Sequence, residues 1–280
     1  MYLDLDRYLR PERVGACLAA LTRPRSAVIA GGTWLNADPS RHAHLAQVVD
    51  LQALALRGIE ADEEAVKIGA LTPLADLVGA VEPDFMAIGM AAAAERNLAI
   101  RNRSTVGGRL CRNAADGRLA TAMLALNCQV EVCTPAGVRE VPLGKHLADV
   151  AAGRLGGVVT RAILESTPGY SAYIDSTLTA VDAPVTDAAL AVCVDGTARV
   201  ATGGHAADAS GALSLPETSA VVAGIGWSKD YAGWRAKVRE AALAEIPSYT
   251  DALATGDYRR HLAATLITRL VGAWLEGGDE

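Results

Sequence analysis

The chain has 280 residues, 51% of them hydrophobic and 21% charged, so it is long enough for two domains and apolar enough to bury a core. Its 32 acidic and 26 basic side chains give a net charge of -6 without a basic run, which argues against a nucleic-acid-binding protein. The N-terminus has no signal-type pattern and no apolar stretch is long enough to span a bilayer, so we expect a cytoplasmic protein without a membrane span.

The N-terminal part predicts a small α/β unit. The expected elements are a helix at 12–21 and strands at 27–30, 48–51 and 65–70. Thr72 is expected to cap a helix that begins with Pro73. The first of these strands runs directly into Gly31 and Gly32, so the order is a strand followed by a glycine turn.

The middle of the chain predicts further helices and an antiparallel hairpin. The expected elements are helices near 90–94 and 119–126, strands at 129–133 and 138–143 around a turn at 134–137, and a strand at 158–164. Between Ser166 and Asp187, Thr, Ser, Pro and Asp are frequent and the periodicity is weak. We place a domain boundary in this stretch.

The last part of the chain predicts a hairpin followed by helices. Asp195-Gly196 suits the positive φ values of a tight turn between strands at 188–194 and 197–202. The terminal helix is expected to begin with Asp257 as its cap and to stop at Gly277-Gly278. Its apolar face contains Leu262, Leu266, Leu270, Val271 and Trp274.

Two Gly-Gly pairs form the candidate binding site. Gly31-Gly32 precedes Thr33, and Gly107-Gly108 follows Thr105. Glycine accepts positive φ and lets a ligand approach the backbone N–H groups closely, so the two pairs could hold a diphosphate-containing cofactor. Two tight turns would explain the same residues, and these residues alone leave both interpretations open.

Three segments resemble the FAD-binding medium subunit of the molybdenum hydroxylase family, which includes the carbon monoxide dehydrogenase and xanthine dehydrogenase flavoproteins. They are Ala30-Gly31-Gly32-Thr33 with Leu35, Ile100-Arg101-Asn102 with Thr105-Val106-Gly107-Gly108 and Leu110-Cys111, and Gly256-Asp257-Tyr258-Arg259-Arg260-His261-Leu262. The resemblance runs over nearly the whole chain. It implies an α+β fold, with a two-lobed vanillyl-alcohol-oxidase-type FAD-binding domain over 1–170 and a small C-terminal domain of an antiparallel sheet and helices over 176–280. The lobes would cover about 1–55 and 56–170.

The resemblance also implies which residues contact FAD. Val159 falls where a Leu or Ile packs on the flavin or adenine, and Trp34 either stacks on the cofactor or fills the core. Asp116 either contacts the ribose or caps a loop. The residues expected around the diphosphate are Ala30, Gly31, Gly32, Thr33, Trp34 and Leu35 from one lobe and Thr105, Gly107 and Gly108 from the other.

Three positions depart from the family pattern. Arg109 stands where Asn is usual, Arg118 where an acidic residue is frequent, and Ile174 where Lys or Arg is common. Arg109 or Arg118 could replace the lost contacts as two-pronged donors to phosphate oxygens. Arg118 could equally be a solvated surface side chain.

Other reactive side chains predict no site of their own. His42 and His44 are expected to be surface residues, because no third metal ligand stands at a suitable spacing. No Ser/His/Asp or Cys/His arrangement indicates a catalytic residue. The cysteines are odd in number and lack C-x-x-C spacing, so we expect reduced, mostly buried thiols and no cluster or zinc site: Cys17, Cys111, Cys128, Cys133 and Cys193.

The resemblance implies an electron-transfer flavoprotein subunit. FAD would receive electrons from a small 2Fe-2S subunit and pass them to NAD, a quinone or oxygen, while a large molybdenum-cofactor subunit oxidises the substrate, in a heterotrimer or its dimer. Arg109, Arg118 and Ile174 motivate an alternative, a scaffold subunit that has lost FAD. A stand-alone flavin oxidase is a third possibility, which the subunit-like C-terminal part disfavours. The sequence leaves the substrate and the electron acceptor open.

Overall fold

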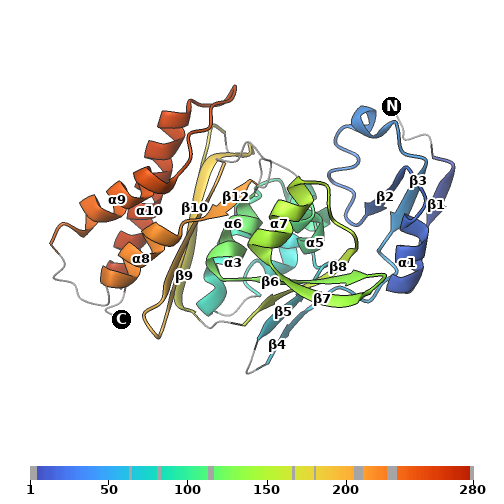
Figure 1. Ribbon diagram of the computed structural model, residues 1–280, viewed down its shortest axis with the longest axis horizontal. Coiled ribbons are helices and arrows are strands. Elements are labelled where there is room, and N and C mark those ends of the chain that lie inside the picture. The colour runs from blue at the N-terminus through green and yellow to red at the C-terminus, as the bar shows by residue number, and fades with distance from the viewer. Residues whose placement is uncertain are drawn as a thin grey trace.

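The computed structural model describes residues 5–62, 65–80, 83–112, 117–165, 168–179, 181–204, 211–225 and 232–277. In these residues the chain forms three sheets, with helices between and beside them (Figure 1). None of the described helices combines the length and the apolar character needed to cross a membrane.

The N-terminal sheet is parallel. Its strand order is β1 (Arg7–Leu9), β3 (Gln47–Asp50) and β2 (Ser26–Ile29), and helix α1 (Val14–Leu21) packs beside it. A 3-10 helix (Pro39–His42) precedes β3. All residues of β3 are buried because it is the middle strand. Parallel pairing brings the carboxyl ends of β2 and β3 to the same edge, where Gly31 follows β2.

The second sheet is antiparallel. Its strands lie in the order β4 (Ile59–Ala61), β5 (Val66–Gly69), β8 (Val158–Leu164), β6 (Gln129–Thr134) and β7 (Gly137–Pro142). The helices of this part are α2 (Leu74–Leu77), the 3-10 helix Pro83–Phe85, α3 (Met86–Ala94), α4 (Leu98–Arg103), α5 (Val106–Leu110), α6 (Arg118–Ala125) and α7 (Leu143–Ala151). Every residue of α6 is buried, because α6 packs against α3, α5 and the third sheet.

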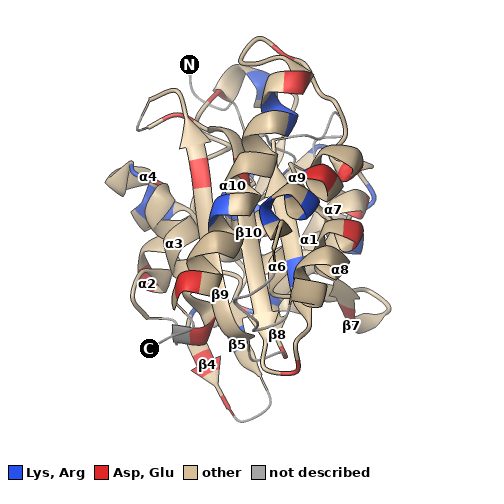
Figure 2. Ribbon diagram, turned by 90° about the vertical axis from the view of Figure 1, so that its left-hand side faces the viewer, with Lys and Arg blue, Asp and Glu red and all other residues tan. Residues whose placement is uncertain are grey.

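The third sheet is also antiparallel and has helices on both faces (Figure 1). Its order is β12 (Ala212–Ser214), β11 (Ala198–Gly203), β10 (Pro184–Cys193) and β9 (Pro168–Thr177). Helices α8 (Pro216–Ile225), α9 (Trp234–Glu245) and α10 (Gly256–Gly277) form the outer layer, over which residues of both charges are interspersed (Figure 2). All of β10 is buried because α10 lies on one side and α3 and α6 lie on the other.

The elements predicted from the sequence are present in type and order, but two predicted caps are wrong. The Thr72 hydroxyl accepts from Gly58 N (2.9 Å) and donates to Gly58 O (3.0 Å), so it fixes a neighbouring loop and caps no helix. Helix α10 begins earlier than expected, and Thr255 Oγ1 accepts from Tyr258 N at 3.3 Å. Asp257 therefore lies inside the first turn, where its charge favours the helix dipole.

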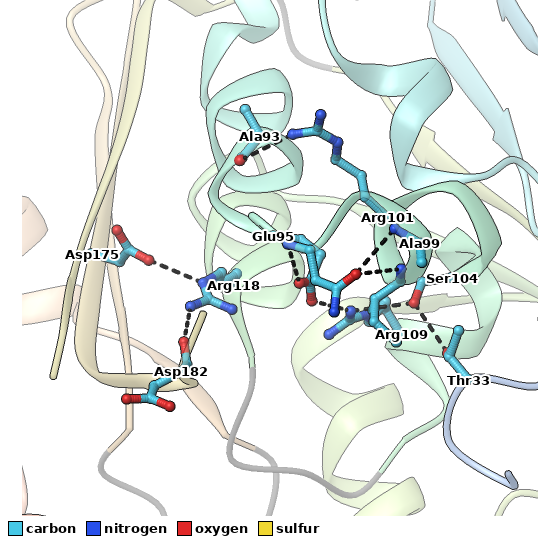
Figure 3. Close-up of polar contacts among 12 residues, drawn as sticks. Thr33, Ala93, Glu95, Ala99, Arg101, Ser104, Arg109, Arg118, Asp175 and Asp182 are labelled. Atoms are coloured by element: carbon cyan, nitrogen blue, oxygen red, sulfur yellow. Dashed lines mark hydrogen bonds and ion pairs between the residues drawn. The ribbon is translucent and has the colours of Figure 1, made fainter. Parts of the chain in front are cut away.

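Buried polar contacts connect α6 with the third sheet, and Figure 3 shows those of Arg118. Arg118 Nε donates to Asp175 Oδ2 at 3.0 Å and Arg118 Nη2 donates to Asp182 O at 2.6 Å. Thr121 Oγ1 donates to the buried Asp187 carboxylate at 2.9 Å. Both expectations for Arg118 are corrected, since its side chain is only 6% exposed and its guanidinium is directed to β9 and the segment after it, where Asp175 supplies the opposite charge.

We predict that Arg118→Met lowers the free energy of unfolding by about 3 to 5 kcal/mol, because it leaves the Asp175 carboxylate buried without this partner. Urea unfolding followed by circular dichroism measures the change. Arg154→Met is the control, since Arg154 pairs with Asp149 at 3.0 Å but is 63% exposed, and it should cost less than about 1 kcal/mol. Equal losses in the two variants would contradict the assignment.

Candidate cofactor site

Both Gly-Gly pairs line one cavity of about 280 Å³ between the N-terminal sheet and α5. The lining comes mainly from residues 27–35, 104–112 and 155–159. Asp116 lies outside the described residues. The other residues expected at the cofactor all line this cavity: Ala30, Gly31, Gly32, Thr33, Trp34, Leu35, Thr105, Gly107, Gly108, Arg109 and Val159.

The first glycine pair is required by a close approach between two backbone segments. A Cβ on Gly31 would lie 1.6 Å from the carbonyl oxygen of Arg103, so no larger residue fits there. Gly32 has φ +74°, in the left-handed region that glycine favours. These two properties place the turn after β2 directly against the end of α4.

The turn after β2 exposes a row of backbone donors to the cavity. Among the described residues, no acceptor bonds the N–H groups from Gly31 to Leu35. All five residues line the cavity. Successive free N–H groups in a turn form a concave anion-binding surface. This row is therefore the strongest anion-binding feature of the site.

The second glycine pair contributes in a different way. Gly107 N donates to Ala70 O at 2.8 Å, and Gly108 N donates to the hydroxyl of Thr105 at 3.2 Å. The backbone donors of this pair are therefore already engaged, contrary to the expectation that they are bare. A Cβ on Gly107 would lie 2.8 Å from the Cβ of Ala70, so this glycine allows α5 to pack closely on the chain after β5.

Arg109 is held by an acidic residue that the sequence analysis missed (Figure 3). Its Nη2 donates to Glu95 Oε2 at 2.7 Å and to Ser104 Oγ at 3.3 Å. The Arg109 and Glu95 side chains are 7% and 11% exposed. Arg109 lines the cavity, but its Nη2 protons are directed to protein acceptors. No local motif marks Glu95, which stands in a loop between α3 and α4.

Trp34 and His42 lie together at the cavity wall. Trp34 is 49% exposed, so it lines the cavity and does not fill a core. Its ring meets the His42 ring edge-on, with centroids 4.5 Å apart. The expectation of a surface histidine is wrong for His42, which is buried and contacts the Trp34 ring, whereas His44 is exposed. The described residues contain no group of three or more His, Cys, Asp or Glu residues placed to hold a metal.

At the end of α5, burial shifts the pKa values of two titratable side chains. Burial raises the pKa of the Cys111 thiol to about 12. It also lowers the pKa of His146, whose Nε2 lies 3.1 Å from Leu110 O. An acceptor carbonyl at that distance requires a donating Nε2–H. All five cysteines are free thiols, as expected, and Cys111 lines the cavity.

We predict that Gly31→Ala lowers the free energy of unfolding by about 3 kcal/mol or more, because the added methyl group collides with backbone atoms that cannot move independently. Urea unfolding measures the loss. Gly15→Ala is the matched control: Gly15 lies in α1 with open space around its Cβ position, so this variant should gain about 0.5 to 1 kcal/mol. A Gly31→Ala variant as stable as the wild type would show that the two segments do not pack closely.

We predict that His146 makes stability fall with decreasing pH. Its pKa is lower in the folded chain than its ordinary value of 6.5, so the unfolded chain binds a proton first and the stabilisation is lost as the pH falls below that value. Wild type should have a higher free energy of unfolding than His146→Gln at about pH 7.5, and this advantage should decrease as the pH is lowered to about 5.5. A difference independent of pH in urea unfolding would contradict this role.

Comparison of the amino-acid sequence with known proteins identifies the family of the chain. Residues 4–163 match the family described as the FAD binding domain in molybdopterin dehydrogenase. The xanthine dehydrogenase FAD-binding subunit of Escherichia coli O157:H7 is 33% identical over 149 residues, a match that spans 50% of each chain. The nicotine 6-hydroxylase medium subunit of Paenarthrobacter nicotinovorans is 28% identical over 97% of this chain and 98% of that one.

Solved structures show the same fold. A chain of the reconstituted CO dehydrogenase from Oligotropha carboxidovorans superposes with a TM-score of 0.85, at 22% identity over 99% of both chains. A chain of quinoline 2-oxidoreductase from Pseudomonas putida 86 gives 0.84, at 21% identity over 100% of both. The α+β class, with a C-terminal sheet and helices after the flavin-type domain, is thereby confirmed. The chain belongs to the family of FAD-binding domains in molybdopterin dehydrogenases, that of the flavoprotein medium subunits of molybdenum hydroxylases.

Proposed function

We propose that the chain binds FAD in the cavity between the two Gly-Gly pairs and acts as the electron-transfer subunit of a molybdenum hydroxylase complex. The observation that carries this proposal is the row of free backbone N–H groups from Gly31 to Leu35 along the cavity. A diphosphate offers anionic oxygens to such a row without requiring a charged side chain. Leu51, Val158 and Val159 add apolar lining of the kind that contacts flat rings.

The residues present fit FAD. The N–H groups of Gly31 to Leu35 would hold the diphosphate, and Val159 would contact a ring of the cofactor. Gly107 lets α5 pack closely on Ala70 at the cavity wall. Bound FAD would supply the electron-accepting and electron-donating chemistry. The polypeptide contributes binding, orientation and exclusion of water.

The departures from the family pattern are compatible with FAD. Glu95 pairs with Arg109, and Asp175 pairs with Arg118, so each replaced position has a partner of opposite charge. Ile174 packs against the C-terminal hydrophobic core. Of the three residues that motivated a scaffold without FAD, Arg118 and Ile174 lie outside the cavity lining, and Arg109 lines the cavity with its charge paired to Glu95.

We extend the proposal to the electron path and the partners by analogy with the family. We place the chain between a small 2Fe-2S subunit, from which FAD receives electrons, and an external acceptor such as NAD, a quinone or oxygen. Substrate oxidation belongs to a large molybdenum-cofactor subunit. The support comes from relatives described as a xanthine dehydrogenase FAD-binding subunit and a nicotine 6-hydroxylase medium subunit.

We predict that the purified chain carries equimolar flavin, measured as visible absorbance and as FAD released by heating. Trp34→Glu should lose most of it, because a carboxylate at this half-exposed cavity position repels a diphosphate. Val194→Glu is the matched control, since Val194 is 79% exposed and lies outside the cavity lining, and it should retain flavin. A wild-type chain that stays colourless with added FAD and within its assembled complex would favour the scaffold function.

A further inference from the structure

A continuous line of polar contacts leads from a buried carboxylate to the cavity (Figure 3). Glu95 Oε2 accepts from Arg109 Nη2 at 2.7 Å, Arg109 Nη2 also donates to Ser104 Oγ at 3.3 Å, and Ser104 Oγ lies 3.1 Å from Thr33 Oγ1. Glu95 lies in the loop after α3 and Ser104 directly follows α4. Arg109 belongs to α5, and Thr33 lies in the turn after β2. The contacts therefore connect the first glycine pair with the second.

The protons in this line can be assigned from the donors available. A guanidinium Nη2 carries two protons, which suffice for Glu95 and Ser104. Ser104 Oγ therefore accepts from Arg109 and retains one proton of its own to donate. Among the described residues, its remaining bonded neighbour is Thr33 Oγ1. The positive guanidinium also turns the Ser104 O–H dipole away from itself, toward Thr33.

We infer that this line orients the Thr33 hydroxyl as a donor to an anionic group in the cavity. If Ser104 donates to Thr33 Oγ1, the Thr33 proton is free to point into the space that Thr33 lines beside the free backbone N–H groups. Ser104 and Arg109 are then positioning residues that act through Thr33. Glu95 fixes Arg109 in place and neutralises it. The inference rests on the proposed function in taking the FAD diphosphate as the anion.

A purely structural role for the same contacts makes a different prediction. If Ser104 acted only through its contact with Arg109, which joins the residue after α4 to α5, its removal would weaken FAD binding whether or not Thr33 has a hydroxyl. If Ser104 acts by orienting the Thr33 proton, its removal has no effect once that hydroxyl is gone. A double-mutant cycle separates the two roles.

The test titrates FAD into flavin-free protein and follows flavin fluorescence for wild type, Ser104→Ala, Thr33→Val and the double variant. Losing a donor to a charged phosphate should weaken the FAD Kd about 10- to 100-fold in Thr33→Val. Losing the orienting contact should weaken it about 3- to 10-fold in Ser104→Ala. The double variant should bind FAD as Thr33→Val does.

A second pair of variants tests the charged end of the line. Glu95→Gln with Arg109→Met removes both charges together, so that neither is left buried without the other. This combined variant should weaken FAD binding when Thr33 is present and should have no effect when Thr33 is replaced by Val. Arg57→Met with Asp76→Asn is the control, since that ion pair has the same 2.7 Å contact but lies outside the cavity lining. It should leave the FAD Kd unchanged in both backgrounds.

The failures are distinguishable. Wild-type protein that binds no FAD overturns the proposed function together with this inference. Wild-type protein that binds FAD while Ser104→Ala binds it equally well, or while the losses of the two single variants multiply in the double variant, overturns only the orientation of Thr33. Melting temperatures of the flavin-free variants, measured in parallel, separate these outcomes from general unfolding.

Discussion

The site depends on one close backbone contact, the approach of Gly31 to the carbonyl oxygen of Arg103. Since no Cβ can be accommodated there, the turn after β2 lies directly against the end of α4. Beside this contact, Thr33 Oγ1 lies 3.1 Å from Ser104 Oγ, and both residues line the cavity. The free N–H row and the hydroxyl contact therefore lie next to the same close backbone approach.

Buried arginines with specific partners hold the surrounding structure together. Arg118 connects α6 with β9 through Asp175, and Arg259 in α10 donates to Val185 O at 2.6 Å and Gly204 O at 2.7 Å. An arginine satisfies several acceptors in a fixed planar geometry, which a lysine cannot reproduce. These contacts connect elements that are distant in sequence, so they fix α6 and α10 on the third sheet.

Periodicity and turn residues predicted most of the fold, because those signals are local. The strands around Asp195-Gly196 and the helix at 119–126 are examples. The sequence also identified both glycine pairs, but not that the Gly107 N–H is engaged by Ala70, since that bond depends on tertiary packing. Glu95 was missed for the same reason: an acid 14 positions from its arginine has no recognisable spacing.

The pairing of Arg109 with Glu95 explains how an arginine is tolerated beside an anion-binding turn. A buried guanidinium without a carboxylate would cost about 3 to 5 kcal/mol, so Arg109 requires an acid close by. Once neutralised, it adds little net charge to the cavity and acts through the hydrogen bonds it donates. On the proposed function, recognition of the diphosphate would then depend on the backbone dipoles of Gly31 to Leu35 and on oriented hydroxyls, which act over short distances and select by geometry. The charged pair of Arg109 and Glu95 therefore lies beside the turn while the N–H groups of Gly31 to Leu35 stay free along the cavity.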